Sequence, residues 1–448
     1  MTKSTRNRRV SVARMRTTGR VIHNWARNEA CIPAGVHRPR STDEVVTAVR
    51  AARREGRRVR VIGGGHSFTP AAMTNGDLLV LDGLADILDV DRTACRVTVQ
   101  AGIRLRDLND RLAEHGLAMP NLGDIDVQSL AGAISTATHG TGLAFGNLAT
   151  TVVGMEIVTG TGEVVRFDTE REPERLRIAR VALGALGVVT EVTLQLVPAF
   201  RLHAVESVEP LDDVLADVDT FARSADHAEL YWMPGARRCQ VKRNRRTDEP
   251  ARPQPRAAYV RDKWIGENIG FGLVCRAGRR FPSLAPKLAK VVAASATERE
   301  LIDRSDKVFT SPRHVRFVEM EYGLPIEHLP EAITRLRGLA AELSFPSLFP
   351  VEVRVSAADD IPLSTGYGRT NGWIAVHQYR GAPYEAYFHG VEAIMREHEG
   401  RPHWGKLHFR SVADLRDLYP EWDAFAALRT ELDPDGTFRN PYLDRVLG

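Results

Sequence analysis

Residues 61–69 read Val-Ile-Gly-Gly-Gly-His-Ser-Phe-Thr, and this stretch decides the fold. Strand-like residues run directly into three glycines and then into His66. Consecutive glycines allow positive φ angles and close approach of the backbone to a ligand, so successive N–H groups can point at one anion. The stretch therefore predicts a loop that cradles a cofactor pyrophosphate, with His66 at its rim.

Two common phosphate-binding motifs do not fit this loop. A P-loop needs a lysine after the glycines, and none follows here. A Rossmann motif opens a helix, whereas Thr69-Pro70 and the turn pair Asn75-Gly76 interrupt this chain. The loop is therefore not the phosphate-binding loop of a P-loop ATPase or of a nicotinamide-dependent dehydrogenase. A glycine-rich bend with a surface histidine would explain this segment alone equally well.

A second segment, residues 121–142, consists mostly of glycine, alanine, serine and threonine. Large apolar side chains are few, so core packing alone does not explain it. Small residues suit close approach of the backbone to a flat ligand, and the hydroxyls and amides can hydrogen-bond to it. The alternative interpretation is a tightly packed helix of small residues.

Further motifs extend these two over most of the chain. They are G-D-I-D-V-Q-S-L-A-G-A-I-S-T-A-T-H-G-T-G at 123–142, A-L-G-A-L-G-V-V-T-E-V-T-L at 182–194, F-P-V-E-V-R at 349–354 and H-W-G-K at 403–406. With them the chain, from about Trp25 onward, resembles flavoproteins of the vanillyl-alcohol oxidase type, in particular the gulono- and arabinono-1,4-lactone oxidoreductases. The resemblance implies an α+β protein with the two-domain FAD-binding fold of that type.

The same resemblance implies FAD as the cofactor. In relatives with this glycine-rich motif the histidine at the position of His66 is joined covalently to the flavin, so covalent FAD is expected. Such a link raises the flavin potential. His139 is expected to make a structural or flavin-edge hydrogen bond. The expected cofactor-binding residues are Ile62, Gly63, Gly64, Gly65, His66, Ser67, Gly123, Asp124, Ser129, Gly132, Ile134, Ala137, Thr138, His139, Gly140 and Val189.

Composition limits the classes of protein to which the chain can belong. The 448 residues are 43% hydrophobic and carry a net charge of +4, which gives a nucleic-acid role little support. No apolar run approaches the roughly 18 residues of a membrane span, and a cytoplasmic enzyme is expected. Four scattered cysteines form no C-x-x-C pair, and His403 and His408 complete no ligand set, so no metal is expected. Residues 1–22 are expected to be a basic disordered tail.

The pattern of apolar residues predicts the domain organisation. Helix and strand patterns alternate over residues 23–200, beginning with a helix capped by Ser41, and predict a mixed α/β FAD-binding domain. Residues 201–400 predict a cap domain of antiparallel sheet covered by helices, which would face the substrate. Within it, the Pro/Arg-rich stretch 244–256 predicts a surface loop. Residues 401–448 are expected to complete the active site.

Glu352 and Arg354 stand two residues apart on a predicted strand, so their side chains share one face, with valines on the other. From the residues alone, a salt-bridged pair at the sheet surface is the alternative, and such a pair contributes only about 0–1 kcal/mol.

The resemblance assigns chemistry to this pair. It implies that Glu352 binds substrate hydroxyls, that Arg354 stabilises negative charge developing on the flavin, and that Lys406 assists. Lys406 could act as a base only if its pKa were depressed, and His377 is a competing base. The expected substrate contacts are Ser129, Glu352, Arg354 and Tyr379.

The predicted activity is oxidation of the carbon-2 hydroxyl of an aldono-1,4-lactone by hydride transfer to FAD. The partners are then a sugar lactone or polyol and an electron acceptor, which is oxygen or another molecule. Gly123 permits oxidase behaviour, since the resemblance implies that a missing methyl group there admits oxygen to the flavin. The alternatives are an alditol oxidase of the xylitol or sorbitol type and a non-catalytic flavin- or sugar-binding protein.

Overall fold

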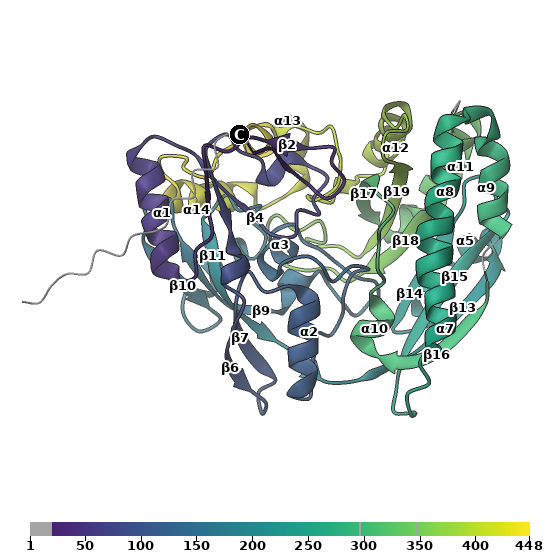
Figure 1. The fold of residues 1–448 in the computed structure, drawn as a ribbon, viewed down its shortest axis with the longest axis horizontal. Helices are drawn as coiled ribbons and strands as arrows, with labels where there is room; N and C mark the ends of the chain where they lie inside the picture. Colours follow the sequence, from purple (N-terminus) through teal and green to yellow (C-terminus); the bar gives the residue numbers. More distant parts are fainter. Residues whose placement is uncertain (1–19, 295–296, 344, 346) are drawn as a thin grey trace, which may run out of the picture.

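The computed structural model describes residues 20–294, 297–343, 345 and 347–448. Two lobes lie side by side, one built mainly from the first two hundred residues and the other from the green middle of the chain (Figure 1). Most of the expected basic tail lies outside the described residues, and at its end Ile22 already belongs to strand β1 (Ile22–His23).

The first lobe combines two small sheets. A parallel sheet of order β3-β5-β4 (Gly35–His37, Asp77–Val80, Val59–Ile62) is covered by helix α1 (Thr42–Arg54). An antiparallel sheet has the order β10-β9-β11-β7-β6. Its strands are Val164–Asp168, Val152–Val158, Val188–Gln195, Arg96–Gln100 and Ile87–Asp91. Helices α2 (Leu105–Glu114), α3 (Leu130–Ser135) and α4 (Pro173–Ala179) complete this lobe, and Ser41 caps α1 by accepting a hydrogen bond from the Glu44 N–H.

The second lobe is an antiparallel sheet of order β16-β13-β15-β14-β18-β19-β17-β20. Its strands are Arg299–Arg304, Arg201–Pro210, Arg238–Thr247, His227–Trp232, Val351–Ser356, Asn371–Tyr379, Phe317–Pro325 and Arg401–Pro402. The loop predicted for 244–256 is wrong for residues 244–247, which finish β15 and pair with β13. Arg245 and Arg246 are both exposed although they point to opposite faces of the strand, so this stretch reads as polar throughout and lacks the alternation that would indicate a strand.

The two faces of this sheet differ in chemistry because side chains alternate along each strand. One face carries Val351 and Val353 and joins the apolar core beneath helices α11 (Leu329–Glu342) and α12 (Glu385–Glu397). Residues paired across neighbouring strands share a face, and the register sets Glu352 opposite Ala375 and Arg354 opposite Trp373. The second face therefore carries the charged residues, and it is turned toward the first lobe.

Residues 401–448 run back across both lobes. After β20 they form α13 (Val412–Leu415), α14 (Trp422–Leu432) and α15 (Pro441–Leu447), whose apolar residues belong to the core of the first lobe. The Val59 N–H donates to the Thr437 carbonyl oxygen over 2.8 Å, and the buried Arg60 guanidinium donates to that of Phe438 over 2.8 Å. Strand β4, which leads into the glycine loop, is thus supported by the C-terminal residues.

Candidate active site

The glycine loop leaves no room for side chains at its first two positions. A Cβ atom on Gly63 would lie 1.9 Å from the Ser129 Oγ, and one on Gly64 would lie 2.7 Å from the Val127 carbonyl oxygen. Gly65 has a φ of +66°, which favours glycine. Gly63 and Gly64 are therefore needed for close packing of the loop against the segment that begins helix α3, and Gly65 is needed for the bend of the backbone.

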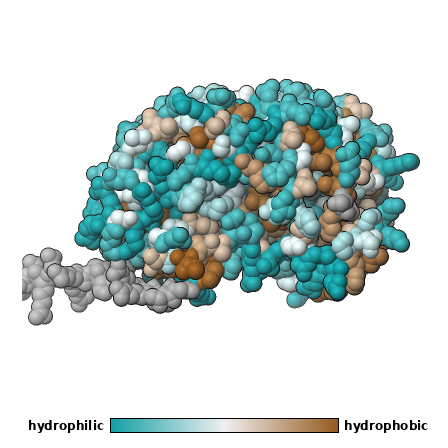
Figure 2. Space-filling view, turned by 90° about the horizontal axis from the view of Figure 1, so that it is seen from above, coloured by the Kyte–Doolittle hydropathy of each residue, from teal (hydrophilic) through white to brown (hydrophobic). Residues whose placement is uncertain are grey.

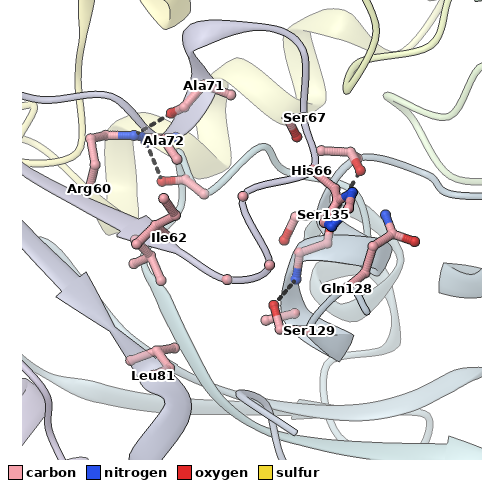
Figure 3. A pocket seen from close by; sticks show the side chains of 18 of the residues that line it. Arg60, Ile62, His66, Ser67, Ala71, Ala72, Leu81, Gln128, Ser129 and Ser135 are labelled. Carbon is pink, nitrogen blue, oxygen red and sulfur yellow. Dashed lines mark hydrogen bonds between the residues drawn. The ribbon is translucent and has the colours of Figure 1, made fainter. Parts of the chain in front are cut away.

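A pocket lies between this loop and α3 (Figure 3). It brings together nine of the expected cofactor-binding residues, Ile62, Gly63, Gly64, Gly65, His66, Ser67, Ser129, Gly132 and Val189. The sequence reasoning missed Arg104, Gln128 and Ser135, although the last two lie within the small-residue segment. The Gln128 Oε1 is buried without a hydrogen-bond donor among the described residues. A narrow glycine-walled pocket with an unpaired acceptor fits a flat polar cofactor such as FAD.

The remaining expected cofactor residues lie outside the lining of this pocket. Ile134 is fully buried in the core beneath α3. Ala137 has a φ of +55° at the bend after α3, and the Thr138 hydroxyl accepts from the Gln128 amide over 3.0 Å. Gly123 and Gly140 pack against each other's segments, because a Cβ on either would meet backbone of the other segment within 3.0 Å.

His66 faces the second lobe from the rim of the pocket. Its ring stacks on Trp25 with centroids 5.1 Å apart. Burial, helped by the charges of Lys406 and Arg104, lowers the pKa of His66 to about 4. The imidazole is therefore neutral at physiological pH, which is the form that can act as a nucleophile.

The H-W-G-K segment connects the glycine loop to the charged sheet face. On one side the Phe68 N–H donates to the Gly405 carbonyl oxygen over 2.7 Å. On the other side the Leu407 N–H donates to the Glu319 carbonyl oxygen over 2.8 Å. Lys406 is thereby held between the two lobes, with its Nζ 2.5 Å from the Glu319 Oε1.

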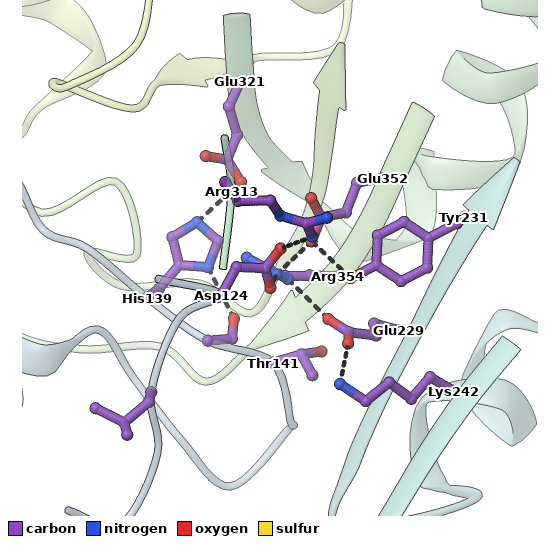
Figure 4. A network of polar contacts seen from close by, with 12 residues as sticks. Asp124, His139, Thr141, Glu229, Tyr231, Lys242, Arg313, Glu321, Glu352 and Arg354 are labelled. Carbon is purple, nitrogen blue, oxygen red and sulfur yellow. Dashed lines mark hydrogen bonds and ion pairs between the residues drawn. The ribbon is translucent and has the colours of Figure 1, made fainter. Parts of the chain in front are cut away.

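Arg354 lies at the centre of a buried network of charges (Figure 4). Its guanidinium pairs with Glu352 from the same strand, with Glu229 of β14 at 3.0 Å, and with Asp124 of the first lobe. The network continues from Glu229 to Lys242 at 3.1 Å and from Asp124 to Arg313 at 2.9 Å. Glu352 and Arg354 are 7% and 8% exposed, so the alternative of a surface pair is wrong.

The carboxyl of Glu352 differs from its neighbours. Burial raises its pKa, the charge of Arg354 acts in the opposite direction, and Asp124 and Glu229 raise it further, so the pKa lies well above the ordinary range. The pKa of Glu229 is lowered instead, because the positive charges of Lys242 and Arg354 more than offset the effect of its burial. Glu352 is thus the carboxyl of this network that binds a proton most readily.

Lys406 does not have the depressed pKa that a base would need. Burial lowers its pKa, but the carboxylates of Glu319 and Glu321 more than offset this effect and the pKa is raised. The side chain is a fixed cation. The His377 Nε2 lies 3.5 Å from the same Glu319 oxygen, and its Nδ1 lies 3.1 Å from the Pro350 carbonyl oxygen.

Two other expected residues have different surroundings. The Ser129 hydroxyl caps α3 by accepting from the Gly132 N–H over 3.3 Å, which places it beside the glycine loop. Tyr379 lies farther along β19 under the guanidinium of Arg279, at 5.5 Å from the ring centroid.

Among the residues that the structure describes, two groups of side chains have the composition of metal ligands, with ligand atoms within 4.8 Å of one another. The first is His139, Glu321 and His403, and the second is Asp124, Glu229 and Glu352. In the first, the His139 Nδ1 lies 2.8 Å from the Gly140 carbonyl oxygen and its Nε2 lies 3.1 Å from the Glu321 Oε1, while the ring stacks on Trp373. In the second, the Arg354 guanidinium takes the position of a cation.

This fold, with a glycine-walled pocket in the first lobe and a buried charged face on the sheet of the second, is that of the two-domain FAD-binding flavoproteins. Residues 33–168 match the FAD binding domain family, and residues 192–446 match the D-arabinono-1,4-lactone oxidase family. The chain belongs to the D-arabinono-1,4-lactone oxidase family. The predicted family and fold are confirmed.

Relatives agree with this assignment over almost the whole chain. The chain is 44% identical to L-gulono-1,4-lactone dehydrogenase of Mycobacterium tuberculosis, covering 95% of this chain and 98% of the relative. It is 33% identical to L-gulonolactone oxidase of Bos taurus, covering 95% and 98%. The structure of cholesterol oxidase from B. sterolicum superposes with a TM-score of 0.81 at 20% identity, covering 96% of each chain, and shows the shared fold. In the part of the chain that the structure describes, no helix is long and apolar enough to cross a membrane.

Proposed function

We propose that the protein oxidises the carbon-2 hydroxyl of an aldono-1,4-lactone of the L-gulono or D-arabinono type. The observation that carries this proposal is the buried pair of Glu352 and Arg354, on the sheet face that contacts Asp124 of the first lobe, in a chain of the lactone oxidase family. FAD would accept the hydride from carbon 2. The glycine loop and the start of α3 would hold it, with Ser129, Gly132 and Val189 along the pocket wall.

The protein residues would handle the proton and the charge. Glu352 would hydrogen-bond to the reacting hydroxyl and take up its proton, since its raised pKa favours proton binding. Arg354 and Lys406 remain charged throughout and would stabilise negative charge on the substrate oxygen and the reduced cofactor. His377, next to Lys406, would complete the substrate side of the site.

Substrate profiling under anaerobic conditions tests this proposal. The bound flavin should bleach with L-gulono-1,4-lactone or D-arabinono-1,4-lactone and respond weakly to xylitol and sorbitol. Faster bleaching by the alditols would replace lactone oxidation with alditol oxidation. Flavin that bleaches with none of these compounds, yet bleaches with dithionite, would point to a non-catalytic binding protein.

We further propose that His66 carries the FAD covalently. The neutral ring at the rim of the pocket supports this role. After acid denaturation, the flavin should stay with the polypeptide, and peptide mass analysis should find it on the peptide that contains His66. His66→Ala should release the flavin on denaturation while Trp25→Phe, which keeps an aromatic ring beside residue 66, should not. Free flavin from the unmodified protein would refute the covalent link.

The electron acceptor is oxygen or another molecule, and Gly123 offers a way to tell them apart. A Cβ there would lie 3.0 Å from the His139 carbonyl oxygen, so alanine fits after a small shift. If oxygen is the acceptor, Gly123→Ala should slow reoxidation of the reduced flavin by at least about tenfold, or 1.4 kcal/mol of barrier. Its reduction by lactone should be unchanged. Equal reoxidation in both proteins would favour another acceptor.

We place this activity in the cytoplasm. All four cysteines are free, and Cys31, Cys239 and Cys275 are buried. Unpaired cysteines suit a reducing compartment. Fractionation of cells that express the tagged full chain would test the location, since recovery from outside the cytoplasmic membrane would contradict it.

A further inference from the structure

One segment of the second lobe exposes an unusual amount of apolar surface. It comprises α7 (Arg256–Tyr259), the π-helix η4 (Val260–Gly270), α8 (Phe271–Arg280), the 3-10 turn η5 (Pro282–Leu284) and α9 (Ala285–Ala294), here called the helical hairpin. Figure 1 shows α8 and α9 standing side by side at the outer edge of the lobe. Among the described residues, nine of the fourteen exposed large apolar side chains lie on it: Tyr259, Val260, Trp264, Ile265, Ile269, Leu273, Phe281, Leu284 and Val291.

These side chains form a surface that packing within the protein does not use. The inner side of the hairpin is anchored by Cys275 and Ala289 against Phe349. On the outer side, Ile265, Ile269 and Leu273 recur every four residues and are 54%, 58% and 57% exposed. That spacing places them in one stripe along a helix. Exposed apolar side chains that gather in this way mark an interaction surface.

The same hairpin is strongly basic. Residues 256–291 contain eight lysines and arginines and two acidic residues, a local charge of +6 in a chain whose net charge is +4. The two acids, Asp262 and Glu267, pair with Arg261 and Lys263. The exposed side chains without an acidic partner among the described residues include Arg256, Arg276, Lys287 and Lys290. Figure 2 shows brown apolar patches among teal polar side chains on this lobe.

We propose that the helical hairpin docks on the surface of a lipid bilayer that contains anionic lipids. Apolar side chains would enter the boundary between headgroups and acyl chains, while lysines and arginines contact the anionic headgroups. A second copy of the chain fits the surface less well, because a twofold contact sets a patch against itself and would bring two charges of +6 together.

Docking would occur beside the substrate side of the active site. The Asn268 amide donates to the Pro312 carbonyl oxygen over 3.2 Å, and its oxygen accepts from the His314 N–H over 2.7 Å. The residue between these two is Arg313, which pairs with Asp124 in the network around Arg354. The hairpin therefore positions the segment that carries Arg313, and a bound bilayer would lie one layer of helices away from it.

Cosedimentation of the flavin-loaded full-length protein with vesicles tests the proposal. The protein should bind vesicles in which a third of the phosphatidylcholine is replaced by phosphatidylglycerol, and bind pure phosphatidylcholine vesicles at least about tenfold more weakly. Raising NaCl from about 0.1 M to about 1 M should weaken binding, because the Debye length falls from about 10 Å to about 3 Å.

Two variants separate the apolar and the electrostatic contributions. The triple change Ile265→Ser, Ile269→Ser and Leu273→Ser should weaken binding to the mixed vesicles by about 100-fold. The triple change Arg276→Glu, Lys287→Glu and Lys290→Glu should do so by at least a similar factor.

A matched control carries Leu88→Ser and Val164→Ser, which are 46% and 44% exposed on the first lobe, and it should bind as the unmodified protein does. All three variants should keep the flavin and the melting temperature. The proposal is overturned if the unmodified protein does not bind the mixed vesicles, or if the serine triple variant binds as well. It is also overturned if sedimentation velocity shows that the apolar surface instead holds a dimer that the serine variant dissociates.

Discussion

Replacement of Glu229 by glutamine removes one buried charge from the network around Arg354. The carboxylate lies 3.0 Å from Arg354 and 3.1 Å from Lys242. At an effective dielectric constant of about 20, each pair attracts by about 5 kcal/mol. The variant also no longer has to bury a carboxylate, and this offsets several kcal/mol of the lost attraction. We therefore expect the free energy of unfolding to fall by about 3 kcal/mol, as is typical when one partner of a buried ion pair is removed.

Thermal unfolding followed by circular dichroism would measure this loss. If the second lobe melts as one unit of about 200 residues, its transition should fall by about 6–12 °C. Glu300→Gln is the matched control, since Glu300 lies in the same sheet, pairs with His203 and is largely exposed. Its transition should move by less than about 2 °C, because an exposed ion pair contributes little.

The same variant should also alter the pH dependence of flavin reduction by lactone. The negative charge of Glu229 helps to raise the pKa of Glu352, so its removal should lower that pKa. The rise of the reduction rate with pH should then occur at lower pH than in the unmodified enzyme. An unchanged melting temperature, or a shift of the pH profile to higher pH, would refute the account of Glu229 as the charge that holds Arg354 and tunes Glu352.

Three further predictions follow from individual residues. Glu352→Gln should lower the rate of flavin reduction by about 10²- to 10⁴-fold and remove its rise with pH in stopped-flow measurements; a rate within twofold of normal would exclude Glu352 as the proton acceptor. Gly63→Ala should give protein with little bound flavin, seen as a low ratio of absorbance at the flavin band to that of protein, because its Cβ would lie 1.9 Å from the Ser129 Oγ. Burial lowers the pKa of His403 and of His408 to about 3, so below the ordinary pKa of 6.5 the unfolded chain binds protons that the folded protein does not. Stability should therefore fall as the pH falls from about 6.5 toward about 3, by about 2 kcal/mol for each histidine at pH 5, and a melting temperature equal at pH 7 and pH 5 would contradict this.

The sequence is enough to predict the pair of Glu352 and Arg354 that we propose for the active site, but not the residues that surround it. Alternation along one strand is enough to put Glu352 and Arg354 on the same face, and the glycines before His66 are enough to predict a close backbone approach. Glu229 escaped notice because its importance depends on the order of strands, which sets β14 beside β18. A signal was present, since Glu229 is a single acidic residue between Ala228 and Leu230 in an otherwise apolar stretch.

The proton affinities could not be predicted from the sequence either. Lys406 is three residues from a histidine in the chain, and nothing local indicates that carboxylates more than eighty residues earlier, Glu319 and Glu321, hold its pKa up. The arginine-rich residues 244–247 were misread for a related reason. Polar side chains predict a loop only when the backbone lacks a partner, and the partner here is β13, some forty residues earlier in the chain.

The contacts between strand β4 and residues 437–438 also set an order of events during synthesis. Arg60 and Phe438 are 378 positions apart, so the ribosome must add that many residues after Arg60 before the strand that presents the glycine loop receives this support. FAD that enters earlier would meet a glycine loop whose leading strand still lacks these two hydrogen bonds. We therefore expect stable binding of FAD only after residues 437–438 have been made, so that yellow colour would report on chains that have reached this point.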